Sequence, residues 1–386
     1  MLKKDITFIY DDSIQKQVFE LIANEAKKRG YQTHFSDNKF EKCEIGFYCD
    51  HINFPNNSKF SIIMLHDITQ QYGNWPDIWL REPWNIYDVG ILPGKTWVEN
   101  WEKCSQYYYA RPKRDMYLVG WPKADIIAGY DLDGIRKEFE LKYHIDSGKK
   151  TILYAPAWEN DNKQDDFVRA MQKLDVNILI KQAPWNPELY PEQIKNIEAM
   201  KKLHEGLPGV HIIDPSTNIL YAIIASDILV SEESSTMCES VMMGKPAISV
   251  SNWLIPDVTP SRYPADNYDF VIKTKKENLS DCVEDVIKNY DKFSAEAEKY
   301  SKDNFQNIGN CSKIIMDIID HYVDGTLLQI EPLTPNADVN VPKNIERWRL
   351  MYRRKKNFYY RVVKRNKFIE NIYSKLIKLK HFLCKS

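Results

Sequence analysis

Short apolar runs alternate with amphipathic stretches along most of the chain. The runs in the first half cover residues 5–10, 31–35, 44–49, 61–65, 89–92 and 116–120, and those in the second cover 151–157, 177–181, 209–214, 227–231, 247–250 and 269–272. Between the first two runs, apolar residues recur at helical spacing from Ile14 to Ala26, and Gly30 follows as a stop signal. Continuous apolar strands with intervening helices are typical of parallel sheets covered on both faces. The pattern therefore predicts an α/β fold with two such units in tandem.

The charged stretch at 141–150 is the best boundary between the two units. We expect an N-terminal Rossmann-like domain over residues 1–145 and a second Rossmann-like domain over 150–330. The chain has 386 residues and 43% hydrophobic content, which is enough for two cores. Three prolines and few apolar residues indicate a linker at 331–344, and a helical tail is expected at 345–386.

The tail is strongly basic although the net charge of the chain is only −1. From Lys343 to the end there are fifteen Lys and Arg against two acids, so the body is acidic. Aromatic and aliphatic residues are interleaved with these bases. Such helices can lie on an anionic membrane surface, bind nucleic acid through the same charges, or pack on the acidic body.

Cellular location can be inferred from segments that the sequence lacks. The N-terminus meets acids at Asp5 and Asp11, unlike a signal peptide, and no run approaches the roughly 20 apolar residues of a transmembrane helix. Seven cysteines without a CxxC pair favour reduced thiols. We therefore expect a cytoplasmic protein.

Polar side chains follow the predicted strands of both units, at the edge where parallel sheets bind ligands. In the first unit they are His66, Asp67, Lys123 and Asp125, and in the second Trp158, Lys181, Ser234, Ser235, Thr236 and Glu239. The two sets would face each other across an interdomain cleft. A two-domain transferase would hold its donor and its acceptor there.

The hydroxyl cluster at 234–236 opens a predicted helix. Thr236 and Glu239 have the spacing of a capping box, and Gly244 followed by Pro246 is a stop signal. The start of the same helix would present free amides and the positive end of its dipole to a phosphate group. Capping and phosphate binding are compatible in one helix.

Three segments resemble the CDP-glycerol glycerophosphotransferase family, whose GT-B enzymes prime or polymerise teichoic acids and related polymers. They are VGWPKADII at 119–127, TILYAPAWEND at 151–161 and ASDILVSEESSTMCESVMMGKPAISV at 225–250, and the resemblance runs over roughly residues 60 to 320. It implies transfer of glycerol phosphate, or a related polyol phosphate, from a CDP donor to a glycan or polymer hydroxyl. The product would be a teichoic acid or capsule-like surface polymer.

The resemblance also implies roles for two residues of the first unit. His66 matches a family histidine that would act as general base, taking the proton of the acceptor hydroxyl as it attacks the β-phosphorus. An imidazole of ordinary pKa, about 6.5, is mostly neutral near neutral pH and suits this role. Asp67 stands where the family has glycine and would orient the imidazole or bind substrate.

The remaining matches imply donor binding. Ser234, Ser235 and Thr236 match a Ser-Ser pair that supports the donor phosphates, and Glu239 would face the same pocket. Lys123 and Asp125 match an Arg and an Asp of the family. Trp158 lies in the second matched segment. Lys181 matches a lysine, but the histidine that the family places shortly after it is missing. His204 or His211 could replace that histidine by another route.

Other functions stay open. The segment ESVMMGKP resembles the E-x4-GKP stretch of nucleotide-sugar enzymes, whose acid binds ribose hydroxyls, so an inverting glycosyltransferase or a UDP-sugar 2-epimerase of the same fold is an alternative. A non-catalytic scaffold of a surface-polymer assembly complex is another. The sequence has no Walker loop and no metal-binding D-x-D pair, and we expect no cofactor and no metal. Because the family reaches lipid-linked acceptors, we expect the tail to bind the inner face of the cell membrane, not nucleic acid.

Overall fold

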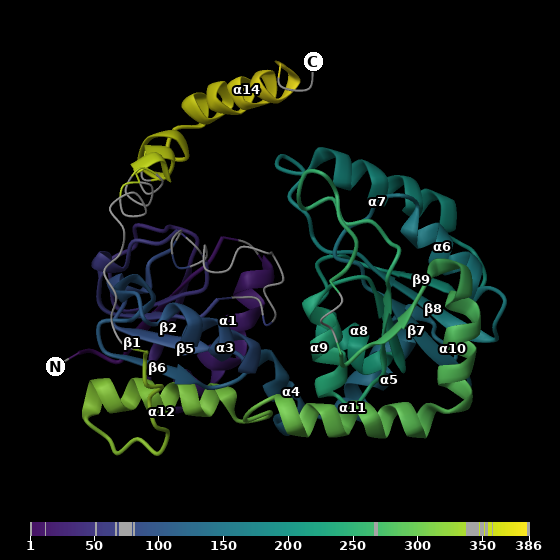
Figure 1. The fold of residues 1–386 in the computed structure, drawn as a ribbon, viewed down its shortest axis with the longest axis horizontal. Coiled ribbons are helices and arrows are strands. Elements are labelled where there is room, and N and C mark those ends of the chain that lie inside the picture. The colour runs from purple at the N-terminus through teal and green to yellow at the C-terminus, as the bar shows by residue number, and fades with distance from the viewer. Residues whose placement is uncertain are drawn as a thin grey trace.

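The computed structural model describes residues 2–11, 13–50, 52–65, 68, 79, 82–265, 269–336, 347, 351, 354–356 and 358–383. They form two lobes side by side, each built on a six-stranded parallel sheet (Figure 1). Each of the twelve predicted runs overlaps a strand, the last of them at Ile272 alone, and the expected α/β class is confirmed.

The first sheet has the strand order β2-β1-β3-β4-β5-β6. Its strands are β1 (Asp5–Ile9), β2 (Gln32–Ser36), β3 (Cys43–Tyr48), β4 (Ser58–Ile63), β5 (Val89–Leu92) and β6 (Asp115–Leu118). Alternate residues of a strand point to opposite faces. Phe8 therefore packs with α1 (Ser13–Lys28) on one face, and Ile9 packs with α3 (Lys95–Cys104) on the other.

The second sheet has the order β12-β11-β10-β7-β8-β9. Its strands are β7 (Lys150–Tyr154), β8 (Val176–Lys181), β9 (Val210–Ile213), β10 (Ile228–Ser231), β11 (Ala247–Val250) and β12 (Ile272–Thr274). One face is covered by α6 (Lys163–Met171) and α10 (Leu279–Lys288), and the other by α5 (Leu132–Tyr143), α8 (Ile219–Ala225), α9 (Ser235–Met242) and α11 (Tyr290–Asn304). The helix α7 (Pro191–His204) connects β8 to β9, and α4 (Ile126–Gly129) precedes α5.

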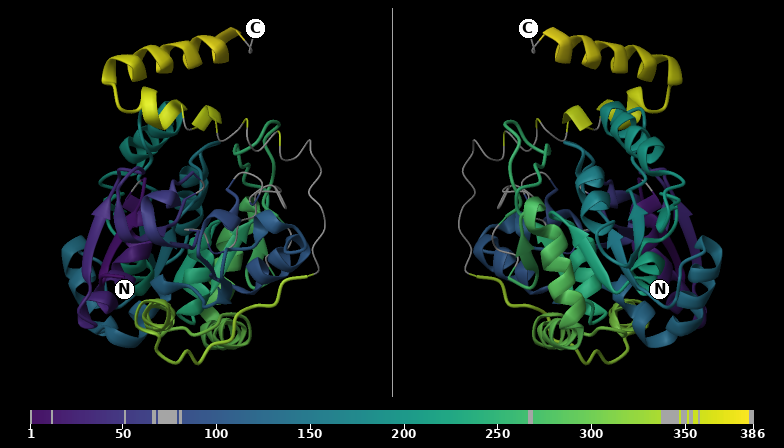
Figure 2. Two further views of the ribbon diagram at one scale, coloured as in Figure 1. Left: turned by 90° about the vertical axis from the view of Figure 1, so that its left-hand side faces the viewer. Right: turned by 90° about the vertical axis from the view of Figure 1, so that its right-hand side faces the viewer.

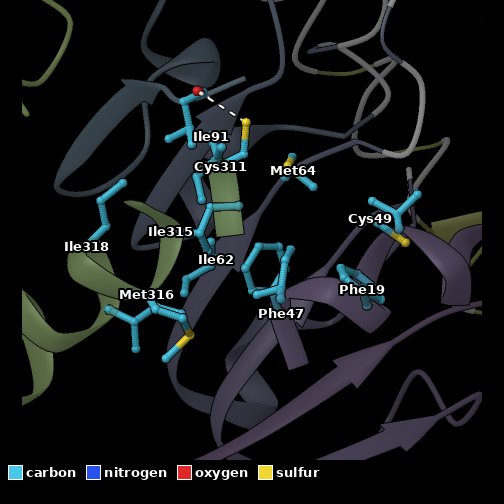
Figure 3. Close-up of a cluster of buried hydrophobic side chains, with 14 of the residues drawn as sticks. Phe19, Phe47, Cys49, Ile62, Met64, Ile91, Cys311, Ile315, Met316 and Ile318 are labelled. Atoms are coloured by element: carbon cyan, nitrogen blue, oxygen red, sulfur yellow. Dashed lines mark hydrogen bonds between the residues drawn. The ribbon is translucent and has the colours of Figure 1, made fainter. Parts of the chain in front are cut away.

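The helix α12 (Cys311–Asp324) returns from the second lobe to the first. Figure 3 shows Cys311, Ile315 and Met316 beside Phe47 and Ile62, in one buried cluster with strands of the first sheet. The expected second unit, 150–330, thus contributes its last helix to the first core. A sequence period shows that a helix is amphipathic but does not show which sheet covers its apolar face.

The basic tail contains a helix that stands apart from both lobes. A single π-helical turn at Tyr359–Val363 precedes α14 (Lys367–Leu383). Figures 1 and 2 show α14 on the side of the molecule opposite α11 and α12. No helix in the described part of the chain is both long enough and apolar enough to span a membrane.

Candidate active site

A pocket of about 150 Å³ opens at the carboxyl ends of the strands of the second sheet, against the start of α1 and the segment after β6. Its charged and hydroxyl-bearing side chains include Lys123 from the first domain and Lys181, Ser234, Ser235 and Thr236 from the second. Much of the remaining wall is made of alanine and proline residues. The structure therefore brings together five of the residues that the strand-end rule selected.

Ser234 caps the start of α9 beside this pocket. Its backbone is extended, and its Oγ accepts hydrogen bonds from the Thr236 amide at 3.3 Å and from the Thr236 hydroxyl at 3.0 Å. The predicted capping box of Thr236 and Glu239 is therefore wrong, because the helix begins two residues earlier. The first turn of α9, with its outward amides, lies in the pocket wall.

The predicted stop of α9 is confirmed. Gly244 has a φ of +68°, and its amide and that of Lys245 donate to the carbonyls of Val241 and Ser240 at 2.9 and 3.0 Å. This pair of bonds is a Schellman motif, which favours glycine because of the left-handed backbone. Lys245 then donates to three carbonyl groups at the end of α8, including that of Ile223 at 2.7 Å. The Gly-Lys-Pro segment therefore connects the ends of α8 and α9.

Glu239 points toward the first domain. It is only 2% exposed, and its Oε1 accepts from Lys123 Nζ at 2.6 Å and from Trp121 Nε1 at 3.0 Å. Its Oε2 is buried and has no hydrogen-bond partner among the described residues. An unpaired buried acceptor costs about 1–3 kcal/mol. Glu239 is not among the residues that line the pocket, so it meets the pocket only through its partner Lys123.

Lys181 is a second buried cation of the pocket. It is 4% exposed, and its Nζ donates to the carbonyls of Gln182 at 2.9 Å and Pro215 at 2.8 Å. Burial lowers the pKa of Lys181 to about 8, against the opposing effect of Asp214, and the nearby charge of Lys123 lowers it further. An anion in the pocket would relieve this repulsion and stabilise both ammonium groups.

Trp158 lies next to the pocket but does not line it. Its ring packs against Trp185 and Tyr190, with centroids 4.5 and 6.0 Å away. Its neighbour Ala157 is part of the pocket wall. The predicted substrate contact of Trp158 would thus be made from an aromatic cluster at the border of the pocket.

A fully buried ion pair that the sequence did not reveal holds the loop after β7. Lys163 and Glu232 lie 2.9 Å apart with both side chains 0% exposed. Glu232 also accepts from the amides of Ala157 and Trp158 at 3.2 and 3.0 Å, and so fixes one wall of the pocket. No local pattern signals this pair, because its members are separated by 69 residues in sequence.

Asp125 does not line the pocket. Its two oxygens accept from the amides of Cys311 at 2.9 Å and Ser312 at 2.5 Å, so it satisfies the start of α12. Burial raises the pKa of the Asp125 carboxyl. We therefore assign Asp125 to the connection between the domains and not to substrate.

Three histidines, His66, His204 and His211, were candidates for the chemistry of the site. His66 and Asp67 lie outside the described residues. Ala183 stands two residues after Lys181 and lines the pocket. His204 is 2% exposed and bonded to Gln164 at 2.8 Å and to Asp165 at 3.1 Å. Neither His204 nor His211, which lies in β9, lines the pocket, so neither replaces the histidine that is missing after Lys181.

A family model described as CDP-Glycerol:Poly(glycerophosphate) glycerophosphotransferase matches residues 80–308, more than half of the chain. The chain belongs to this family. It is accordingly a glycerophosphotransferase, and the resemblance noted in the sequence is confirmed. The comparison with curated proteins gives no match.

Solved structures show the fold of this transferase. It is similar to the wall teichoic acid polymerase TagF, at 15% identity over 83% of this chain and 89% of that chain, with a TM-score of 0.58. It is also similar to S. aureus MnaA with UDP, at 14% identity over 87% and 100% of the chains and a TM-score of 0.57. A UDP-GlcNAc 2-epimerase from Neisseria meningitidis with UDP-GlcNAc matches at 13% identity over 82% and 98%, with a TM-score of 0.54. The fold is GT-B, as expected.

Proposed function

We propose that this transferase moves glycerol phosphate, or a related polyol phosphate, from a CDP donor to a hydroxyl group of a glycan or polymer during synthesis of a teichoic acid or capsule-like polymer. The observation that carries the proposal is the convergence of Lys123, Lys181 and the first turn of α9 on one pocket. Two ammonium groups and helix N-terminal amides are suited to a pyrophosphate. The family description and a TagF variant soaked with CDPG support the donor class.

In the proposed reaction the acceptor hydroxyl oxygen bonds to the β-phosphorus, which carries glycerol. The bond from this phosphorus to the bridging oxygen breaks, and CMP leaves with the electron pair. His66 takes the proton of the acceptor hydroxyl, and Asp67 orients its imidazole. Lys123, Lys181 and the hydroxyls of Ser234 and Ser235 stabilise the charge on the phosphates and on departing CMP.

A nucleotide-sugar enzyme is the second candidate, and Glu239 favours it. The unpartnered Oε2 of Glu239 could accept from a ribose hydroxyl of any nucleotide, and UDP-sugar epimerases share the fold. Ala183, in place of a histidine, weakens the match to the family chemistry at this point. Both candidates use the same donor pocket and differ in the group that is transferred.

A nucleotide-release screen tests the proposal. Purified protein is given CDP-glycerol, CDP-ribitol, UDP-sugars or CMP-sugars with membrane extract as acceptor, and CMP, CDP and UDP are measured. We expect CMP from CDP-glycerol or CDP-ribitol, lost in His66→Ala but kept in a control, His34→Ala, whose side chain is 58% exposed. UDP or CDP release alone would establish the second candidate. If His66→Ala keeps its function in the cell and the wild type releases no nucleotide in the screen, the non-catalytic scaffold is supported instead.

We also propose an anionic membrane surface as a partner, bound through the tail. The exposed side chains of Phe368, Ile372, Leu376 and Leu379 lie at helical spacing and form one apolar stripe along α14. Lysines surround it, and Glu370 is the acid of this helix. Apolar burial and attraction to anionic lipids act together in such helices. Flotation with vesicles that contain phosphatidylglycerol tests this, and binding to nucleic acid instead would overturn it.

A further inference from the structure

The tail is attached to the first domain by a cluster of contacts at residues 359–365, here called the joint. Val363 is 1% exposed. The ammonium group of Lys39 lies 4.8 Å from the centroid of the Tyr360 ring. Lys39 is itself buried between Asp11 and Asp50, at 2.7 and 2.6 Å. The tail therefore contacts the first domain at the joint and does not simply extend into solvent.

Two arginines of the joint stack on aromatic rings of the body. The guanidinium groups of Arg361 and Arg365 lie 5.2 and 4.8 Å from the ring centroid of Phe40. Phe40 is stacked on Phe54 at 4.3 Å, and Arg361 reaches this second ring as well. These contacts attract each guanidinium group to the negative face of a ring. Together they are enough to favour one docked arrangement of the joint.

The direction of α14 is also fixed at the joint. The rings of Tyr359, in the joint, and Tyr373, in the second turn of α14, have centroids 5.5 Å apart. The Nζ atom of Lys364 lies 3.7 Å from Asp11 Oδ1, and this ion pair holds the C-terminal end of the joint on the first domain. The apolar stripe of α14 therefore has a defined orientation relative to the first sheet.

The joint lies at the edge of the first sheet that borders the active site. Asp11 follows β1, Lys39 follows β2 and Asp50 follows β3, so all three stand at carboxyl ends of parallel strands. The helix that begins after Asp11, α1, contributes Ile14 and Gln17 to the donor pocket. The body contacts of the tail and the pocket thus share one edge.

We propose that the joint is a rigid mount, which holds the membrane-binding stripe of α14 so that the strand-end edge of the first domain faces the anionic bilayer. An acceptor anchored in that bilayer can then reach the acceptor side of the site directly. With a loosely tethered enzyme, the site would first have to rotate toward the bilayer. The inference rests on the proposed function, and specifies how the membrane partner is oriented. It assigns Phe40 and Tyr360 as positioning residues.

Two pairs of variants of the full-length protein separate the stripe from the joint. Leu376→Glu places a charge in the stripe, and Ser374→Glu places the same charge on the opposite face of α14. Phe40→Ala removes the ring beneath both arginines without changing the tail. Its control is Tyr130→Ala, which removes a ring that is 42% exposed and lies outside the joint. Phe35 is not used as the control because it packs against the core. Each protein is tested for flotation with phosphatidylglycerol vesicles, for CMP release with an acceptor in those vesicles, and for CMP release with a water-soluble acceptor.

Leu376→Glu should lose vesicle binding at least tenfold, whereas Ser374→Glu should keep most of it. Phe40→Ala should bind vesicles normally, keep its activity on the soluble acceptor, and lose severalfold in activity on the vesicle acceptor. Its amides at 359–365 should also exchange faster with deuterium in the absence of vesicles, which needs no turnover. Equal activity of Phe40→Ala on both acceptors would show that α14 is a loose tether. If the wild type releases no CMP with the vesicle acceptor and none with the soluble acceptor, the proposed function is refuted. The exchange and flotation results would then still test the rigid mount separately.

Discussion

Lys123 and Glu239 form a buried ion pair between the two domains, with Nζ and Oε1 2.6 Å apart. Lys123 belongs to the segment after β6 of the first domain, and Glu239 to the helix that starts at the donor pocket. Trp121 donates to the same oxygen from the same segment. With the donor in the proposed site, a contact to Lys123 would lie at the junction of the domains and would couple donor binding to their relative position.

Removing one partner of this pair should destabilise the protein. Lys123→Met leaves the Glu239 carboxylate buried without its cation, and we expect a loss of about 3–5 kcal/mol in the free energy of unfolding. Urea denaturation measures it. The double variant Lys123→Met/Glu239→Gln should recover part of the loss, because no unpaired charge remains. A single-variant loss as small as that of Lys113→Met, at a half-exposed surface lysine, would contradict the assignment.

The same pair shows where sequence analysis reached its limit. Apolar runs such as 227–231 marked the strands of the described residues, most closely where the strand is buried, because a buried parallel strand needs continuous apolar residues. Gly244 marked the end of α9 because a left-handed C-cap favours glycine. In contrast, the partner of Glu239 is not local: Lys123 is far away in sequence, and only the packing of the domains brings the two together.

Local chemistry was ambiguous at the start of α9. Ser234, Ser235 and Thr236 are all competent N-cap residues, and the spacing to Glu239 favoured Thr236. The structure uses Ser234, because Glu239 is engaged by the other domain and does not fold back. For Asp125, a position at a strand end suggested a ligand contact, whereas the side chain caps a helix that begins 186 residues later.

Substitutions of Ser234 should separate capping from donor binding. Asn and Asp both cap helices well, so Ser234→Asn and Ser234→Asp should unfold at nearly the wild-type temperature, whereas Ser234→Ala should lose about 1 kcal/mol. Ser234→Asp places a negative charge in the proposed phosphate site. We therefore expect its KM for the CDP donor to rise at least tenfold above that of Ser234→Asn. Equal KM values for these two variants would place the phosphates elsewhere.

Asp125→Ala should weaken the protein without changing donor binding. Its carboxylate accepts from two amides at the start of α12, and loss of such a cap costs about 0.5–2 kcal/mol. Thermal unfolding measures this loss, and Asp125→Asn is expected to restore part of it. The KM for the donor should stay within about twofold of the wild type, since caps act on stability and not on the pocket. A large rise in KM at unchanged stability would show instead that Asp125 contacts the substrate.

Lys181 should make donor binding depend on pH. Burial lowers its pKa to about 8, so the free protein loses this charge as the pH rises through about 8. Phosphate beside the ammonium group favours the charged form, and donor affinity is therefore highest below that pH and falls above it. We expect the KM for the donor to rise roughly tenfold once Lys181 is neutral, as for loss of one charged hydrogen bond. Lys181→Arg remains charged and should show a flatter profile.

Stability should respond to the same titration with the opposite sign. Because the pKa of Lys181 in the folded protein, about 8, lies below the ordinary lysine pKa of 10.5, the unfolded chain binds the proton more tightly between these two values. The contribution of Lys181 to the free energy of unfolding therefore increases as the pH rises from about 8 toward 10.5, while donor affinity decreases. Urea denaturation of wild type and Lys181→Met across this range isolates the contribution of Lys181. If wild type and Lys181→Met have parallel stability profiles, Lys181 is not the group that titrates, and the pH dependence of donor binding must come from another residue.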